Sequence, residues 1–428
     1  MLNKNGLNFI DLFAGAGGLS EGFIQAGYNP IAHVEMDESA AKTLETRSAY
    51  YYLKNKKNAM KWYYQYERGE ISREELFSHV PNDVAKTVIN AEMSPSTLSN
   101  IFERIDSIIR EDDIKQVDLI IGGPPCQAYS LVGRAQSSHM SVPMKDDPRN
   151  ELYKMYTRFL SRYQPEMFVF ENVSGLMTAR GGEAFKNLTA QLRRVGYSID
   201  CVEQNAADFG VLQNRKRIII IGWKKGTDHY YPEFKKNRSK ALVKDILEDL
   251  ASVERGEENN NYSIPYSECS SYLKKNKIRT SNDVVTHHMA RPNNERDIEI
   301  YEMAINAYKE GKRISYDKLP ERLQTHKNLN SFKDRFKVVE GNDSACHTVL
   351  AHLAKDGHYF IHPDIKQCRS ITVREAARLQ TFPDSYYFEG SRGDKFKQIG
   401  NAVPPMMAKA IAEELKKQLL VKDDSNNE

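Results

Sequence analysis

One cysteine in a rigid turn is the residue of this sequence best suited to covalent chemistry. Cys126 lies in the segment Gly-Gly-Pro-Pro-Cys-Gln at 122–127, directly after the apolar run 117–121. The run predicts a buried parallel strand, and the two glycines and two prolines end it in a stiff turn. The thiol then stands at the carboxyl end of a strand, where open α/β sheets bind ligands, and a fixed mounting suits a nucleophile.

An acidic residue follows a second apolar run. Glu171 comes directly after the predicted strand 167–170, so we expect it at the same edge of the sheet as Cys126. A thiol and a carboxyl facing one pocket suggest a nucleophile with a proton donor or acceptor. Without Cys126, Glu171 would be interpreted as an ordinary polar residue at the end of a strand.

Two arginines, Arg215 and Arg217, stand at the start of a further predicted strand, 217–221. In an extended chain Gln213, Arg215 and Arg217 share one face, because side chains of a strand alternate. Two guanidinium groups on one face suit a phosphate or a developing negative charge. The alternative is a solvated basic edge, which is the commoner fate of such runs.

A glycine-rich turn at 14–18 follows the first predicted strand, 7–13. Glycines let a backbone approach a ligand closely, but Ser20 stands where a dinucleotide fingerprint needs its third glycine. Glu35 ends the second strand, 30–34, where an acid would hold a ribose diol. The pattern fits a nucleoside ligand without a diphosphate, or a turn needed only for close packing of helix on strand.

The elements around these residues predict an α/β fold. Strands at 7–13, 30–34, 117–121 and 167–170 alternate with helical apolar spacing, which is typical of a parallel sheet. The polar, tyrosine-containing stretch 47–116 is interpreted as a helical insertion.

The chain of 428 residues carries a net charge of only +3, which neither indicates nor excludes nucleic-acid binding. Its five cysteines are scattered without metal-site spacing, so we expect free thiols, a reducing compartment and no metal. No apolar run approaches a membrane span of about 20 residues, and the first residues lack a signal-peptide core. We therefore expect a soluble cytoplasmic protein without a membrane partner.

Six segments in this order resemble the DNA (cytosine-5) methyltransferase family. They are residues 11–18, 123–127, 171–173, 213–217, 374–383 and 398–404. The resemblance implies a Rossmann-like S-adenosylmethionine-dependent methyltransferase domain with a smaller target-recognition domain. One departure is Leu212, where the family usually has proline.

The resemblance also implies a mechanism. The Cys126 thiolate would add to carbon 6 of a cytosine flipped out of double-stranded DNA, and Glu171 would share a proton near N3. Carbon 5 would then take the methyl group of S-adenosylmethionine. Arg215 would be the catalytic arginine beside the base.

Positions that match the family's motifs give the further site residues. The expected cofactor contacts are Phe13, Gly15, Gly17, Gly18, Leu19, Glu35, Met36, Asp106, Pro125, Leu152, Asn401 and Val403. The expected DNA contacts are Gln127, Ser130, Arg134, Arg149, Gln213 and Arg217, with residues 128–148 as a loop that closes on DNA.

The implied domain organisation has four parts. They are a catalytic, cofactor-binding domain at 1–225 with the insertion at 47–116, a target-recognition domain at 226–368, a hinge at 369–396, and a C-terminal segment at 397–428 whose helix returns to the catalytic domain.

In its length and in having a single recognition region, the chain resembles the modification enzymes of bacterial restriction–modification systems. We therefore expect a monomer, with any companion endonuclease acting separately. Three alternatives remain. An RNA methyltransferase of the same superfamily would typically carry Cys-Phe-Thr after the glutamate motif, which is absent. A non-catalytic DNA-binding regulator would be expected to lose Cys126 or Glu171, and a dinucleotide oxidoreductase needs the full glycine fingerprint.

Overall fold

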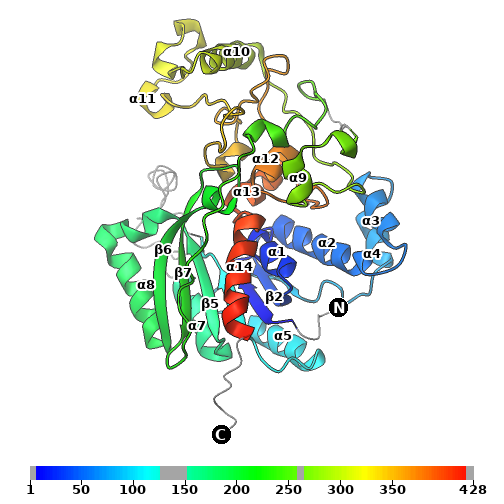
Figure 1. The fold of residues 1–428 in the computed structure, drawn as a ribbon, viewed down its shortest axis with the longest axis vertical. Helices are drawn as coiled ribbons and strands as arrows, with labels where there is room; N and C mark the ends of the chain where they lie inside the picture. Colours follow the sequence, from blue (N-terminus) through cyan, green and yellow to red (C-terminus); the bar gives the residue numbers. More distant parts are fainter. Residues whose placement is uncertain (1–5, 126–151, 258–264, 421–428) are drawn as a thin grey trace.

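The computed structural model describes residues 6–125, 152–257 and 265–420. Its centre is a seven-stranded sheet with the order β3-β2-β1-β4-β5-β7-β6 (Figure 1). The strands are β1 (Asn8–Leu12), β2 (Asn29–Glu35), β3 (Val88–Asn90), β4 (Leu119–Gly122), β5 (Met167–Asn172), β6 (Tyr197–Asn205) and β7 (Lys216–Lys224). The α/β class predicted from the sequence is confirmed.

Strand direction decides where a site can form. β1 pairs in parallel with β2 and β4, β2 with β3, and β4 with β5, whereas β7 runs antiparallel to both β5 and β6. The carboxyl ends of β1 to β5 therefore meet at one edge of the sheet, the edge where open α/β sheets bind ligands.

Helices cover both faces of the sheet, and alternate strand residues point to each face. Ile120 and Phe168 pack with α5 (Leu98–Glu111), α7 (Leu152–Tyr163) and α8 (Glu183–Arg194). On the other face, Ile121 and Val169 pack with two other helices. These are α1 (Gly18–Gln25) and α14 (Pro405–Leu420).

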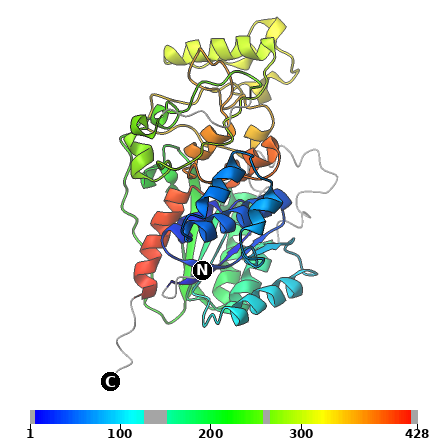
Figure 2. The same cartoon turned by 90° about the vertical axis from the view of Figure 1, so that its right-hand side faces the viewer.

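The C-terminal helix lies directly against the first helix, as both views show (Figures 1 and 2). A Cβ atom on Gly22 would stand 2.4 Å from the Cβ of Ala408, so only glycine permits this approach of α1 and α14. Tyr28 donates a hydrogen bond of 3.0 Å to the carbonyl of Ala412. The last helix thus completes the core on this face of the sheet.

The stretch 47–116 differs from the helical insertion that the sequence predicts. It includes the end of α2 (Glu38–Lys54), then α3 (Met60–Glu67) and α4 (Arg73–Ser78), but also β3 and α5, which belong to the sheet and its cover. The sequence does not reveal β3, because a strand of three residues is too short to show an alternating pattern of polar and apolar residues. The additional helices are α3 and α4 alone.

The described residues between 242 and 368 form most of a second lobe beyond the carboxyl edge of the sheet (Figure 2). The chain before them differs from the predicted recognition domain, because Tyr231 and Phe234 pack on the sheet together with α14. Its helices are α9 (Ser271–Lys275), α10 (Glu295–Lys309) and α11 (Leu329–Phe332), and long irregular segments join them. Between the lobe and the sheet lie α12 (Val373–Leu379), buried on all sides, and α13 (Arg392–Asn401). Thr372 and Glu375 form a capping box at the start of α12.

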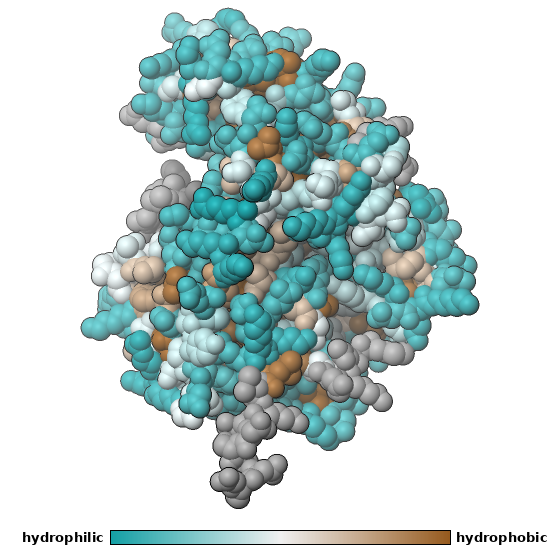
Figure 3. Space-filling model, in the orientation of Figure 1, coloured by the Kyte–Doolittle hydropathy of each residue, from teal (hydrophilic) through white to brown (hydrophobic). Residues whose placement is uncertain are grey.

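The face of the molecule in Figure 3 is mostly hydrophilic, with apolar residues in small patches. Among the described helices, none combines the length and apolar character needed to cross a membrane. The described ranges also contain no group of three His, Cys, Asp or Glu side chains that could hold a metal ion.

Candidate active site

A cavity of about 1100 Å³ opens at the carboxyl edge of the sheet. The residues that follow β1, β2, β3, β4 and β5 form most of its wall, and the segment 394–403 closes another side. It therefore lies at the edge where the sequence predicts the glycine turn, Glu35, the cysteine turn and Glu171 to meet.

The glycine-rich turn has a backbone that few other residues could adopt. Gly15 and Gly17 have φ values of +55° and +77°, and Phe13 also has a positive φ of +57°. A Cβ atom on Gly15 would find nothing within 4 Å, so the turn leaves open space beside the cavity. A Cβ atom on Gly18 would stand 2.4 Å from the carbonyl of Val403, so the turn also touches the C-terminal segment.

Glu35 joins the turn to the end of β2. Its Oε2 accepts a hydrogen bond of 2.7 Å from the backbone N–H of Gly15, and its Oε1 accepts one of 2.8 Å from the N–H of Asp37. Burial raises the pKa of Glu35, although these backbone donors act in the opposite direction. Each carboxyl oxygen has a second lone pair that could accept a bond from a ligand hydroxyl.

Ten of the twelve expected cofactor positions line the cavity. They are Phe13, Gly15, Gly18, Leu19, Glu35, Met36, Pro125, Leu152, Asn401 and Val403. Gly17 does not line it; it is the N-cap residue of α1, packed beside Leu44 and Tyr386. Asp106 does not line it either.

The expectation for Asp106 is corrected by its position on α5. Its carboxylate forms an ion pair with Arg162 and accepts a 3.1 Å hydrogen bond from the Tyr163 hydroxyl. The residues that reach the cavity from this part of the chain are 91–95, at the carboxyl end of β3. Among them Glu92 carries the carboxylate. The sequence signal was missing because β3 itself was not recognised.

Glu171 and Arg217 form an ion pair on the cavity wall. The Arg217 Nε lies 2.9 Å from Glu171 Oε1. Burial raises the pKa of Glu171, and the neighbouring Arg217 and Arg215 only partly offset that effect. A Cβ atom on Gly123 would stand 2.6 Å from Glu171 Oε2, so the glycine before the cysteine turn makes room for this carboxyl group.

The turn that leads into Cys126 is fixed next to this pair. The side-chain amide of Asn172 donates a 3.1 Å hydrogen bond to the carbonyl of Pro124. The end of β5 therefore holds the chain after β4 at Pro124, and Gly123 lies beside Glu171. Cys126 itself, with Gln127, Ser130, Arg134 and Arg149, lies outside the described residues.

The expectation for Arg215 as the arginine beside the base is also corrected. Arg215 is fully buried, and its Nη1 and Nη2 donate to the carbonyls of Val349 at 2.7 Å and Gly400 at 3.0 Å. It does not line the cavity, whereas Arg217 does. Arg215 therefore connects the second lobe to α13.

Gln213, an expected DNA contact, is equally buried. Its Nε2 donates to the carbonyl of Leu379 at 3.0 Å, and its Oε1 accepts from the N–H of Val349 at 2.9 Å. The cause is that β7 begins only at Lys216, and the backbone of Leu212 and Asn214 bonds to Cys346 in the second lobe. Gln213, Arg215 and Arg217 therefore do not share one face of a single extended strand, as the sequence predicts, and of the three only Arg217 lines the cavity.

Acidic groups dominate the cavity. Among the described residues, seven acids line it against two bases, Arg217 and Lys397. The acids are Asp11, Glu35, Asp37, Glu38, Glu92, Glu171 and Asp394. Such a site favours a ligand with positive charge. Lys397 and Asp394 were missed by sequence reasoning, although Lys397 immediately precedes the motif at 398–404.

Comparison with known proteins identifies the family of the chain. The C-5 cytosine-specific DNA methylase family matches residues 7–61 and 86–417. The type II methyltransferase M.Bpa9945I of Bacillus paralicheniformis is 40% identical over 95% of this chain and 98% of its own. The type II methyltransferase M1.HphI of Haemophilus parahaemolyticus is 30% identical over 95% of this chain and 86% of its own.

A prophage-encoded E. coli protein assigned as a DNA modification methyltransferase has the same fold, with a TM-score of 0.63 and 24% identity over 97% of this chain and 99% of its own. The family match leaves out residues 62–85, which hold most of α3 and all of α4. A match over nearly the whole remaining chain, together with a relative 40% identical over almost all of both proteins, shows that this chain belongs to the C-5 cytosine-specific DNA methylases, the DNA (cytosine-5) methyltransferases.

Proposed function

We propose that the cavity binds S-adenosylmethionine and that Cys126, Glu171 and Arg217 carry methyl transfer to carbon 5 of a cytosine flipped out of double-stranded DNA. The observation that carries this proposal is the Glu171 carboxyl group, paired with Arg217 on the cavity wall and beside the turn that enters Cys126. A nucleophile and a proton donor then face the same space.

The donor set of the cavity fits this cofactor. Its sulfonium and ammonium groups are cationic, and seven acidic side chains line the cavity among the described residues. Glu35 would accept the ribose hydroxyls, since it ends β2 and keeps free lone pairs. The open space beside Gly15 would accommodate the amino-acid part. When bound, the cofactor supplies an electrophilic methyl group.

The protein's own groups prepare the base for that methyl group. The Cys126 thiolate forms a bond to carbon 6, and the electron pair of the ring double bond moves towards carbon 5. Glu171, with its raised pKa, holds a proton at N3 and so stabilises the activated ring. Loss of the carbon 5 proton to a base then allows the thiolate of Cys126 to leave.

Arg217 takes the role that the sequence analysis gave to Arg215. Its guanidinium faces the cavity and fixes the orientation of Glu171, so it could also hold the polar edge of the base. Arg215 has a structural role between the lobes, because both of its bonded carbonyls lie outside the cavity lining.

We further propose that the enzyme is the modification member of a bacterial restriction–modification system. The relatives named above are called type II methyltransferases, and the chain covers most of their length. In this setting the enzyme would act in the cytoplasm as a monomer, and any cognate endonuclease would act separately.

Trapping on modified DNA tests the proposal. DNA in which 5-fluorocytosine replaces cytosine should hold an active enzyme in a covalent complex when S-adenosylmethionine is present, because fluorine cannot leave as a proton does. Peptide mapping should place the bond at Cys126, and Cys126→Ser should abolish it. Cys201→Ser, which alters a half-buried thiol on β6, is the matched control and should trap normally. An adduct on RNA alone, or none at all, would contradict the proposed reaction.

A further inference from the structure

Tyr386 contacts the glycine-rich turn of the cavity without lining the cavity. It lies in the segment between α12 and α13 and is only 1% exposed. Its hydroxyl donates a 2.5 Å hydrogen bond to the carbonyl of Ala16, which lies between Gly15 and Gly17. A Cβ atom on Gly17 would stand 3.0 Å from the same hydroxyl, so the tyrosine packs closely against the turn.

The hydroxyl of Tyr386 is a dependable donor. Burial raises the pKa of Tyr386, and the group therefore keeps its proton at any pH at which the enzyme works. Gly15 and Gly17, on either side of Ala16, both have positive φ values, which glycine adopts without preferring them. An external bond to the middle of such a turn selects one conformation among several.

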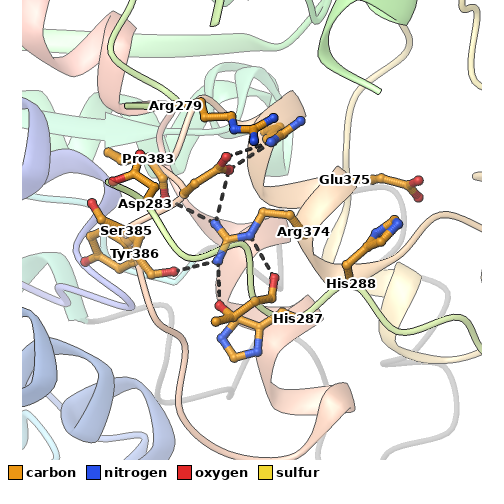
Figure 4. Close-up of polar contacts among 12 residues, drawn as sticks. Arg279, Asp283, His287, His288, Arg374, Glu375, Pro383, Ser385 and Tyr386 are labelled. Atoms are coloured by element: carbon orange, nitrogen blue, oxygen red, sulfur yellow. Dashed lines mark hydrogen bonds and ion pairs between the residues drawn. The ribbon is translucent and has the colours of Figure 1, made fainter. Parts of the chain in front are cut away.

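Arg374 connects the segment of Tyr386 to the second lobe (Figure 4). This fully buried arginine donates to the carbonyls of Pro383 and Tyr386, both at 3.1 Å. It also donates to the carbonyl and the hydroxyl oxygen of Thr286, both at 3.0 Å. Thr286 lies in the second lobe, so one guanidinium group holds the lobe and the tyrosine segment together.

Two residues of the catalytic part hold the same segment from another direction. Arg47 of α2 and Tyr63 of α3 both donate to the carbonyl of Ser385, each at 3.0 Å. Arg47 is itself held by Glu21 of α1 through an ion pair of 2.6 Å, and its guanidinium lies 4.7 Å from the centre of the Tyr386 ring. The position of Tyr386 is therefore set by both parts of the molecule.

We propose that Tyr386 is a positioning residue that sets the shape of the cofactor turn, and that Arg374 makes this shape depend on the second lobe through Thr286. The proposal rests on the proposed function only in taking the cavity as the S-adenosylmethionine site. Because Arg374 couples the lobe to the turn, a change at Thr286 then changes cofactor affinity even though Thr286 lies outside the cavity.

Removal of the Tyr386 hydroxyl tests the positioning role of this residue. Tyr386→Phe should weaken binding of S-adenosylhomocysteine, measured by calorimetry on the full-length enzyme without DNA, by about fivefold, the usual value of one hydrogen bond. In methyl transfer to unmodified genomic DNA, the KM for the cofactor should rise while kcat at saturating cofactor stays the same. Tyr197→Phe is the matched control, since its buried hydroxyl also donates to a carbonyl, that of Pro165 at 2.8 Å.

Thr286→Val tests the link to the second lobe. It removes one acceptor of Arg374 without substituting Tyr386 or any residue that lines the cavity. Through the link we expect S-adenosylhomocysteine to bind about twofold more weakly, with Thr286→Ser close to wild type. Equal affinities of the valine and serine variants would overturn the link, and a Tyr386→Phe enzyme with wild-type affinity and KM would overturn the positioning role. A wild-type enzyme that does not bind S-adenosylhomocysteine would instead overturn the cofactor site on which both depend.

Discussion

The Nε of Arg217 lies 2.9 Å from Oε1 of Glu171, and each side chain is only 12% exposed. The pair stands on the wall of the cavity, where the guanidinium favours the charged form of the carboxyl and burial favours the neutral form. Burial prevails, so the pKa of Glu171 is raised. A carboxyl of this kind binds a proton more readily than an ordinary glutamate and is still oriented by its partner.

Arg217 and Arg215, two residues apart, should respond differently to the same substitution. Arg217→Ala should lower kcat about 100-fold or more with little change in melting temperature, because it removes the partner of a reacting acid. Arg215→Ala should lower stability by about 2–4 kcal/mol, because it leaves two buried carbonyls without donors and opens a cavity. Turnover and thermal unfolding of both variants check this prediction.

Equal losses of activity at unchanged stability in the two variants would contradict this assignment. They would return Arg215 to the catalytic role that the sequence analysis gave it.

The raised pKa of Glu171 predicts the direction of the pH dependence. If the protonated carboxyl is the active form, kcat/KM should fall as pH rises through the pKa of Glu171 in the free enzyme. Arg217 lowers that pKa, so Arg217→Ala should move the falling limb to higher pH. A pH–rate profile of wild type and variant measures both effects. A limb that moves to lower pH, or that persists in Glu171→Gln, would show that another group titrates.

The residues that sequence reasoning placed correctly are those next to long, regular strands. Glu35 and Glu171 each stand at the carboxyl end of a buried strand of the parallel sheet, so both had to reach its carboxyl edge. Arg215 was misplaced because the chain before β7 bonds to the second lobe, a long-range contact that no local pattern encodes. Asp106 was misplaced because β3 has only three residues. The second lobe has little periodicity, so its packing could not be predicted.

Glu35 and Asp106 offer a direct test of the corrected cofactor site. Glu35→Gln should weaken S-adenosylhomocysteine binding at least tenfold, because one carboxyl oxygen that accepts a backbone N–H becomes an NH₂ group. Asp106→Asn should leave the affinity unchanged, since its partners are Arg162 and Tyr163 on the outside of the cavity wall. Calorimetry with S-adenosylhomocysteine on both variants measures these affinities. Weaker binding in the Asp106 variant would restore its predicted role.

Glu67, at the end of α3, is a buried acid in the segment that the family match leaves out. Neither carboxyl oxygen has a hydrogen-bond partner among the described residues, and the side chain lines a small cavity of about 90 Å³ between α3 and the second lobe. Arg47 and Arg374 favour its charged form, but burial, with Asp283 and Asp384, raises its pKa well above the ordinary 4.5. His287, Arg392 and Lys395 also line this cavity.

This acid should make the stability of the enzyme depend on pH. Below about pH 4.5 the carboxyl is protonated in both the folded and the unfolded chain, and its contribution to stability is fully present. As the pH rises towards the higher pKa of the folded state, the unfolded chain releases the proton first, so the free energy of unfolding falls. Glu67→Gln cannot ionise, and its stability advantage over wild type should therefore grow from pH 5 to pH 8.5.

Melting temperatures across that pH range, on wild type, Glu67→Gln and Glu70→Gln, measure the effect. Glu70 lies three residues away and is exposed, with its pKa lowered by Arg68, so its variant should follow the wild-type curve. Parallel curves for wild type and Glu67→Gln would mean that the buried carboxyl does not change its ionisation on folding. Arg47 and Arg374 would then compensate its charge fully, and the junction between α3 and the second lobe would be insensitive to pH.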